Sequence, residues 1–253
     1  MNIRNTIFEN ESPEMILAFE KAQENFKYFW RELYWEYRRI VPAFELAYVK
    51  CAFTQEHIDF PDSPLVEYMW INQIDFDGNT ISGHLMNQPN YIKNTQAGEK
   101  VERPFETIVD WMFLAQDQVH GGFTIQEYRK QLNDSEQKEY DNAWGINFGN
   151  PNKTLLVYDQ EMHPENLIEH PMCESMLDSF LNFIHTNPAV LHERDEHGNQ
   201  LLHREVIAGN FLFVQALLEH DIDKLVLNNQ SMTALDLACK MGWEHIKKLL
   251  EEL

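Results

Sequence analysis

Residues 200–211 read QLLHREVIAGNF, and residues 233–244 read TALDLACKMGWE. The second segment begins 33 residues after the first, so that Gly242 corresponds to Gly209. Each copy starts with a short apolar-periodic run, reaches a glycine that can end a helix, and continues into a second apolar run. This spacing predicts two stacked helix–turn–helix units in the last third of the chain.

A period of 33 residues is typical of ankyrin repeats. Gln200-Leu201-Leu202-His203 and Thr233-Ala234-Leu235-Asp236 resemble the Thr-Pro-Leu-His motif of that family, although both copies lack the proline. Glu205 occupies the position where the motif has a small alanine. Ankyrin stacks bind partner proteins through their turns and concave helix face. The resemblance therefore implies a partner-binding surface at the turns that precede the two copies, formed by Asp195, Glu196, His197, Asn228 and Asn229.

Two repeats are fewer than the three or so that are stable without help. A predicted helix over residues 173–186 offers five apolar side chains to cover the first repeat: Met176, Leu177, Phe180, Phe183 and Ile184. We expect this helix, or the N-terminal region, to cap the array. The resulting prediction is an all-α ankyrin-repeat domain at residues 173–253, preceded by a Pro- and Asn-containing linker at residues 149–172.

The N-terminal region, residues 1–148, begins with a long predicted helix. Ser12-Pro13-Glu14 supplies a capping hydroxyl, a first-turn proline and an acid near the positive end of the helix dipole. Apolar residues follow at spacings of three and four, and Pro42 ends the pattern. The stripe is rich in aromatic side chains, which at this spacing usually form a core and less often a ligand site.

Strand signals follow the long helix, and two further helices are predicted after them. Asp77-Gly78 is a strong hairpin signal, and its weak likeness to a calcium loop lacks the spaced oxygen ligands. Thr124 to Glu127 forms a capping-box pattern that opens a helix through Leu132. The predicted strands are Phe44–Phe53, Glu67–Phe76 and Thr80–Met86, and a short helix is predicted at Phe105–Leu114. These elements predict an α+β domain in which a long helix packs on a small antiparallel sheet.

The N-terminal region resembles the bacterial domain-of-unknown-function family 2314. The matching residues are Glu67-Tyr68-Met69-Trp70, Gly83, Asn87-Gln88-Pro89, Gly98, Asp110-Trp111-Met112 and Gly121-Gly122-Phe123-Thr124. The resemblance implies a small α+β fold, often found beside ankyrin repeats, without an established activity. It is also similar to domains proposed as immunity proteins in bacterial toxin systems, which is an analogy of fold rather than of site.

Four residues of the N-terminal region form a candidate pocket: Glu67, Trp70, Asp110 and Trp111. Burial on a strand could raise the pKa of Glu67 and make it a general base. The alternative is that Glu67 caps a neighbouring backbone or faces solvent. Trp70 and Trp111 are expected to form the core where helix meets sheet. An open pocket beside Glu67 or Asp110 would favour an enzyme, whereas a filled core would favour a binding protein.

Composition excludes several classes of function. Forty-one acids and twenty bases give a net charge of −21, which repels nucleic acid and anionic membranes. No histidine or cysteine spacing is typical of a metal site, no cofactor motif is found, and no Gly-x-Ser-x-Gly elbow occurs. The N-terminus has no apolar signal-peptide core, and three separated cysteines suit a reduced compartment, so a cytoplasmic protein is expected.

The sequence therefore predicts a cytoplasmic bacterial protein that binds another protein without catalysis. The high negative charge favours a basic partner such as a nuclease toxin, which would make the protein an immunity protein. A simpler interpretation of the charge is that it maintains solubility. The alternative function is an enzyme in which the N-terminal domain is catalytic and the repeats recruit substrate.

Overall fold

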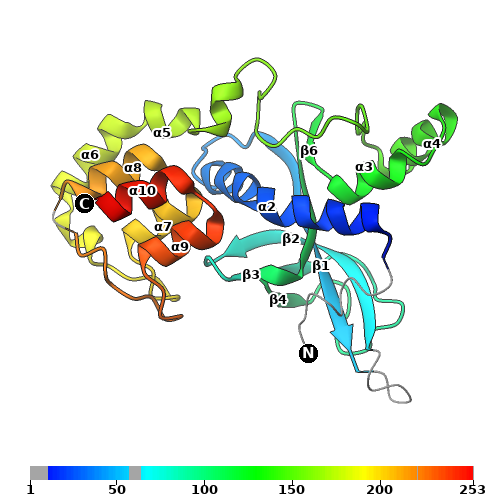
Figure 1. Ribbon diagram of the computed structural model, residues 1–253, viewed down its shortest axis with the longest axis horizontal. Helices are drawn as coiled ribbons and strands as arrows, with labels where there is room; N and C mark the ends of the chain where they lie inside the picture. The colour runs from blue at the N-terminus through cyan, green and yellow to red at the C-terminus, as the bar shows by residue number, and fades with distance from the viewer. Residues whose placement is uncertain (1–10, 57–63, 221, 253) are drawn as a thin grey trace. The chain divides into compact units, whose positions relative to one another are not determined.

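The structure is a computed structural model that describes residues 11–56, 64–220 and 222–252 (Figure 1). The chain divides into two compact units. Unit 1 consists of Met1–Phe29 and Arg39–Tyr158, and unit 2 consists of Trp30–Arg38 and Asp159–Leu253.

Unit 1 contains a six-stranded antiparallel sheet with the strand order β4-β3-β2-β1-β5-β6. The long helix α2 (Pro13–Glu36) starts as the sequence predicts, because the Ser12 hydroxyl accepts a hydrogen bond from the Met15 amide at 3.2 Å. The other elements of unit 1 are β1 (Phe44–Gln55), β2 (Leu65–Phe76), β3 (Thr80–Leu85), β4 (Lys100–Pro104), the 3₁₀ turn η1 (Phe105–Thr107), β5 (Ile108–Ala115), β6 (Gln118–Gly121), α3 (Phe123–Arg129) and α4 (Asp134–Trp144).

The predicted hairpin between β2 and β3 is confirmed. Asp77 Oδ1 accepts hydrogen bonds from the amides of Asn79 and Thr80 at 2.7 and 2.6 Å, and Gly78 has a φ of 97°. A residue with a side chain rarely adopts this φ, so glycine fits the turn. The carboxylate of Asp77 thus closes the turn itself.

The helix predicted at Phe105–Leu114 is wrong, because η1 and the strand β5 occupy that stretch. All eight residues of β5 are buried. A strand covered on both faces carries apolar residues on both of them, here with Asp110 as the exception, and a short run of this kind cannot be distinguished from a buried helix by periodicity. The strands β4 and β6 and the helix α4 were also missing from the prediction.

The two faces of the sheet in unit 1 carry different parts of the core. Trp111 contacts the middle of α2, where its indole N–H donates to the Ala22 carbonyl at 2.9 Å and its ring lies 5.5 Å from that of Phe29. Trp70 belongs to a cluster on the other face with Met112, Ile125, Ile146 and Phe148. The expectation that both tryptophans are core residues is therefore met, on opposite faces.

Unit 2 is helical, as predicted. Its elements are η2 (Pro164–Leu167), α5 (Pro171–Ser175), α6 (Leu177–Thr186), η3 (Pro188–Leu191), α7 (Leu201–Ala208), α8 (Phe211–Leu218), α9 (Ala234–Met241) and α10 (Glu244–Glu252). The helix predicted at 173–186 is two helices, α5 and α6, that meet at Met176. Phe180 and Ile184 are buried as expected, whereas Met176 and Phe183 are exposed.

Helices α7 and α9 both end at the glycines that the repeat predicts. Gly209 and Gly242 follow these helices with φ angles of 75° and 68°, in the left-handed conformation. Gly209 has a second role, because a Cβ at this position would lie 2.3 Å from the Trp243 indole. The missing side chain lets the two repeats approach each other closely.

The last turns of α2 belong to unit 2 and pack on its first repeat. The Trp35 ring stacks on that of His170 at 5.4 Å and meets Phe213 of α8 edge-on at 5.6 Å. Phe213 in turn stacks on Phe180 of α6 at 3.9 Å. The first repeat is thus covered by side chains from α2, the turn before α5, and α6.

The position where the ankyrin motif has alanine is filled by a buried polar cluster. Glu205 Oε1 accepts hydrogen bonds from the Tyr34 hydroxyl and from Arg38 Nη2, both at 2.8 Å. Glu205 Oε2 accepts from Asn210 Nδ2 at 2.6 Å, and Asn210 Oδ1 accepts from Trp35 Nε1 at 2.8 Å. Burial, followed by the Glu205 charge, raises the pKa of Tyr34 well above its ordinary value. Glu205 therefore joins the end of α2 to the repeat.

Candidate functional site

The two ankyrin turns have the same hydrogen-bond design, 33 residues apart. Asp195 Oδ1 accepts from the amides of His197 and Asn199 at 3.0 and 2.8 Å. Asn228 Oδ1 accepts from the amides of Gln230 and Met232, both at 3.0 Å. Asp195 and Asn228 therefore shape their own turns.

The second turn is also bonded to the first. Asn229 donates from its backbone amide to the His197 carbonyl and from Nδ2 to the Glu196 carbonyl, both at 3.0 Å. Asn228 Nδ2 donates to Asn199 Oδ1 at 2.9 Å. The structure thus brings together all five predicted partner-binding residues, and three of them, Asp195, Asn228 and Asn229, hold the turns in place.

Glu196 and His197 form the outer part of this turn surface. The Glu196 side chain is 83% exposed and that of His197 is 38% exposed, and Glu196 Oε1 lies 3.5 Å from His197 Nε2. Because the backbone beneath them is fixed by the two turns, these side chains are presented from a rigid base. They are the members of the predicted set that can meet a partner without breaking the repeat.

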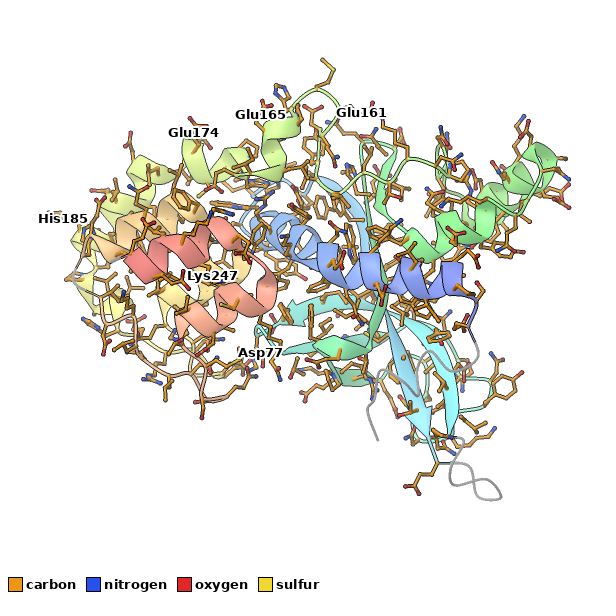
Figure 2. The ribbon with its side chains drawn as sticks, in the orientation of Figure 1. Asp77, Glu161, Glu165, Glu174, His185 and Lys247 are labelled. Carbon is orange, nitrogen blue, oxygen red and sulfur yellow. The ribbon has the colours of Figure 1, made fainter. Side chains whose placement is uncertain are left out.

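Carboxylates dominate the exposed surface of unit 2. Glu161, Glu165 and Glu174 are exposed and extend away from the ribbon (Figure 2). Two basic side chains near the turns donate to backbone carbonyls instead, Arg194 to Leu227 at 2.9 Å and Lys224 to Leu250 at 2.8 Å. Residues 151–253 contain seven bases and seventeen acids, a net charge of −10. Acidic side chains therefore outnumber basic ones in this part of the chain.

The four residues of the candidate pocket in unit 1 do not form one site. Glu67 lies on β2, and its carboxylate accepts hydrogen bonds from the backbone amides of Asn90, Tyr91 and Ile92 in a loop at 2.8, 3.1 and 3.3 Å. Burial raises the pKa of Glu67, but these hydrogen bonds outweigh it and the pKa is lowered. The arrangement matches the capping alternative and opposes a general base with a raised pKa.

Asp110 is a buried structural carboxylate. Its Oδ1 accepts from the amides of Trp111 and Phe123, both at 2.8 Å, and its Oδ2 accepts from the Thr124 amide at 2.9 Å and the Thr124 hydroxyl at 2.5 Å. Asp110 therefore caps the first turn of α3 from β5. The predicted capping box beginning at Thr124 is wrong, because Thr124 lies inside α3 and Gly122 precedes the helix.

A cavity of about 340 Å³ lies next to Asp110. Its lining residues are Glu11, Met15, Phe19, Lys50, Tyr68, Thr124, Ile125, Tyr128 and Tyr140, and we call it the Lys50 cavity. None of the four predicted pocket residues lines it. Lys50 lies opposite Asp110 in the pairing of β1 with β5, and its Nζ donates to Thr124 Oγ1 at 3.4 Å.

The electrostatics of the Lys50 cavity centre on its lysine. Burial lowers the pKa of Lys50, and the charge of Asp110 opposes that shift. Lys50 Nζ also lies 5.5 Å from the centre of the Trp70 ring, within the range of a cation–π interaction. The arrangement presents a cation to the cavity and neutralises Asp110, while Thr124 connects the two groups.

Neither unit considered alone offers an evident metal centre. Within each unit, the described residues contain no three His, Cys, Asp or Glu side chains whose ligand atoms all lie within 4.8 Å of one another. The search for membrane spans, made over the same described residues, found no helix that is long and apolar enough to cross a bilayer.

Comparison with known proteins identifies the family of unit 1. The sequence profile described as "Uncharacterized protein conserved in bacteria (DUF2314)" matches residues 12–148. The chain belongs to the DUF2314 family. Within this DUF2314 domain lie both the Lys50 cavity and the buried carboxylate of Asp110.

Two curated proteins are similar to this DUF2314 protein. A Neisseria meningitidis serogroup B protein, provisionally named an ankyrin repeat protein, is 47% identical over 234 residues, which cover 92% of this chain and 91% of the relative. The uncharacterized protein YegJ of Escherichia coli K12 is 28% identical over 64 residues, or 25% of this chain and 42% of YegJ. No solved structure matches the chain.

Sequence reasoning missed Lys50, which lines the cavity of the DUF2314 domain. The available signal was a lysine in the middle of an otherwise apolar strand, Ala47-Tyr48-Val49-Lys50-Cys51. Lysine is rarely buried without a partner, so its position predicts either a buried carboxylate or a cavity. The structure supplies both.

Proposed function

We propose that this DUF2314–ankyrin protein binds a partner protein through the turn surface of unit 2 and that it does so without catalysis. The observation that carries the proposal is that some turn residues stabilise the turns while others lie at the surface. Asp195, Asn228 and Asn229 are used by the fold, while Glu196 and His197 remain at the surface. Ankyrin repeats commonly bind partners through such turns.

The partner proposed here is basic. The exposed carboxylates of unit 2 supply the attraction, and Arg194 and Lys224 are hydrogen-bonded to the backbone near the turns. A nuclease toxin is one class of partner with this charge, and the protein would then be an immunity protein. The immunity role is tested in two steps. The partner is first isolated by affinity purification with this protein as bait, and it is then produced in cells with and without this protein. A toxin partner should arrest growth unless its immunity protein is present.

The geometry at the predicted catalytic candidates supports binding over catalysis by those residues. Both Asp110 oxygens already accept two hydrogen bonds each, and Trp111 is buried under α2. The lowered pKa of Glu67 makes it a weak base. Catalysis by these residues would require them to give up the contacts that stabilise the fold.

We expect charge reversal on the turn surface to slow association. Glu193 and Glu196 are exposed and lie three residues apart at the first turn. The double variant Glu193→Lys and Glu196→Lys should reduce the association rate of the partner by about three- to tenfold, because exposed charges at the rim of an interface mainly affect the rate of encounter. Asp195 is left unchanged, since its carboxylate shapes the turn. Stopped-flow measurement over a salt series provides the readout.

The matched control is Glu102→Lys with Glu139→Lys, two exposed positions on β4 and α4 of the DUF2314 domain. This control changes net charge equally and should preserve more of the association rate than the turn variant. Association with the wild type should slow as salt rises, since the screening length falls to about 8 Å at physiological ionic strength. Equal effects of the two variants, or a rate independent of salt, would contradict electrostatic steering by the turns.

A further inference from the structure

The Lys50 cavity has the size and lining of a small-molecule site. Its volume of about 340 Å³ lies at the lower end of the range in which proteins bind small organic ligands. It is formed by three parts of unit 1: the start of α2, the centre of the sheet, and the helices α3 and α4. Such a cavity can enclose one compact molecule.

The walls of the cavity are aromatic and apolar. The Tyr128 and Tyr140 rings lie 5.3 Å apart on one side, and the Phe19 and Tyr68 rings lie 5.3 Å apart on another. Met15 and Ile125 complete the apolar lining. A lining with two pairs of aromatic rings favours a flat, apolar ligand body.

The polar groups in and beside the cavity differ in how many hydrogen bonds they already make. The described structure gives Lys50 one hydrogen bond, the contact with Thr124 Oγ1 at 3.4 Å, although an ammonium has three N–H donors. The acceptors nearby differ: Asp110 accepts four hydrogen bonds, whereas Glu11, at the edge of the lining, accepts one from the Tyr68 side chain and keeps acceptor capacity. A ligand that reaches the Lys50 ammonium therefore meets a donor with capacity left, next to a carboxylate, Asp110, whose acceptor sites are in use.

We propose that the Lys50 cavity binds a small carboxylic acid with a flat apolar body, whose carboxylate accepts hydrogen bonds from Lys50. The body lies against the tyrosine-lined walls. A charged pair of this kind forms shorter and stronger hydrogen bonds than neutral groups form. Asp110 orients the Lys50 ammonium through the Thr124 hydroxyl. The proposed site binds the ligand and does not require it to react.

Phenylacetate is the probe, because it combines a carboxylate with one aromatic ring. Three relatives separate the contributions of its parts: phenylacetamide lacks the charge, phenethylamine reverses it, and acetate lacks the ring. Titrations of the full chain, followed by amide chemical shifts, measure affinity and location together. We expect phenylacetate to bind with a dissociation constant of about 0.1–1 mM and to shift the amides of Thr124, Ile125 and Tyr128.

The expected order of affinity follows from the positive charge of Lys50 and from the aromatic lining of the cavity. Phenylacetamide should bind at least about tenfold more weakly than phenylacetate, and phenethylamine and acetate should not saturate. Absence of saturable phenylacetate binding up to about 10 mM would overturn the proposal. Equal binding of phenylacetamide, or shifts confined to residues outside the cavity, would overturn it as well.

Variants then test the role of Lys50. Lys50→Met retains the length of the side chain and removes the ammonium, and it should weaken phenylacetate binding at least about tenfold. Lys130→Met is the matched control, since Lys130 is an exposed lysine that pairs with Glu127 at 2.7 Å, and it should bind like the wild type. Unchanged binding by a folded Lys50→Met variant would overturn the assignment. If that variant does not fold, the ligand series with the wild-type chain still decides the question.

Discussion

Replacing Asp110 by alanine should destabilise the DUF2314 domain by about 3–5 kcal/mol. The change removes the acceptor for the Phe123 and Thr124 amides at the start of α3 and for the Thr124 hydroxyl. It also leaves Lys50 without the carboxylate opposite it. Each buried donor that loses its partner costs about 1–3 kcal/mol, and an uncompensated buried charge adds to this.

Urea denaturation combined with hydrogen exchange measures the effect of Asp110→Ala. Hydrogen exchange should accelerate in α3 and β5, and it should change less in the helices of unit 2. Glu139→Ala on the exposed side of α4 is the control and should change stability by less than about 0.5 kcal/mol. A loss below about 1 kcal/mol for Asp110→Ala would mean that the carboxylate is not needed to cap α3.

Replacing Glu205 by alanine, the residue that the ankyrin motif has at this position, should destabilise unit 2 by about 3–5 kcal/mol. The reason is that Tyr34, Arg38 and Asn210 all donate to this fully buried carboxylate. Burial lowers the pKa of Arg38, but the Glu205 charge, the Tyr34 hydroxyl and the hydrogen bond to Glu205 together raise it above its ordinary value, so the guanidinium stays ionised and needs its partner. A consensus substitution is therefore expected to harm this repeat.

Hydrogen exchange in α7, α8 and the last turns of α2 provides the readout for Glu205→Ala. The double variant Glu205→Ala with Arg38→Met should recover part of the loss, because it removes the charge that the single variant leaves unpaired. Glu219→Ala, at an exposed position after α8, should have little effect. A stable Glu205→Ala variant with normal exchange would show that the alanine of the motif suits this chain after all.

The sequence predicted the elements whose signals are local. The start of α2 follows from Ser12 and Pro13, the β2–β3 turn from Asp77 and Gly78, and the ankyrin turns from the 33-residue period. Each of these is fixed by side chains within a few residues of the backbone they organise. Such short-range chemistry is visible in one sequence.

The missed features depend on long-range contacts. Strand β5 is covered on both faces, so its apolar residues carry neither the period of a strand nor that of a helix. Thr124 resembles a helix cap, but its hydroxyl donates to Asp110, which is 14 residues away in the sequence. The sequence also showed that Glu205 departs from the motif without indicating that its partners are on α2.

The candidate sites were predictable to different extents. The turn residues were found because the repeat fixes their place, although their division into structural and exposed members required the hydrogen bonds. The Lys50 cavity was missed because its lining comes from α2, β1, β2, α3 and α4. Glu67 and Asp110 were proposed as members of one pocket, whereas in the structure each carboxylate accepts hydrogen bonds from backbone amides at a different place.

Photo-crosslinking in the native cell tests most directly whether unit 2 binds a partner through its turn surface. A photoreactive amino acid replaces Glu196, and the same residue replaces Glu136 on α4 in a matched strain. We predict one dominant cross-linked protein, rich in Lys and Arg, from position 196 and little of it from position 136. The same pattern of cross-links from both positions, or no specific product from position 196, would contradict binding at the turns.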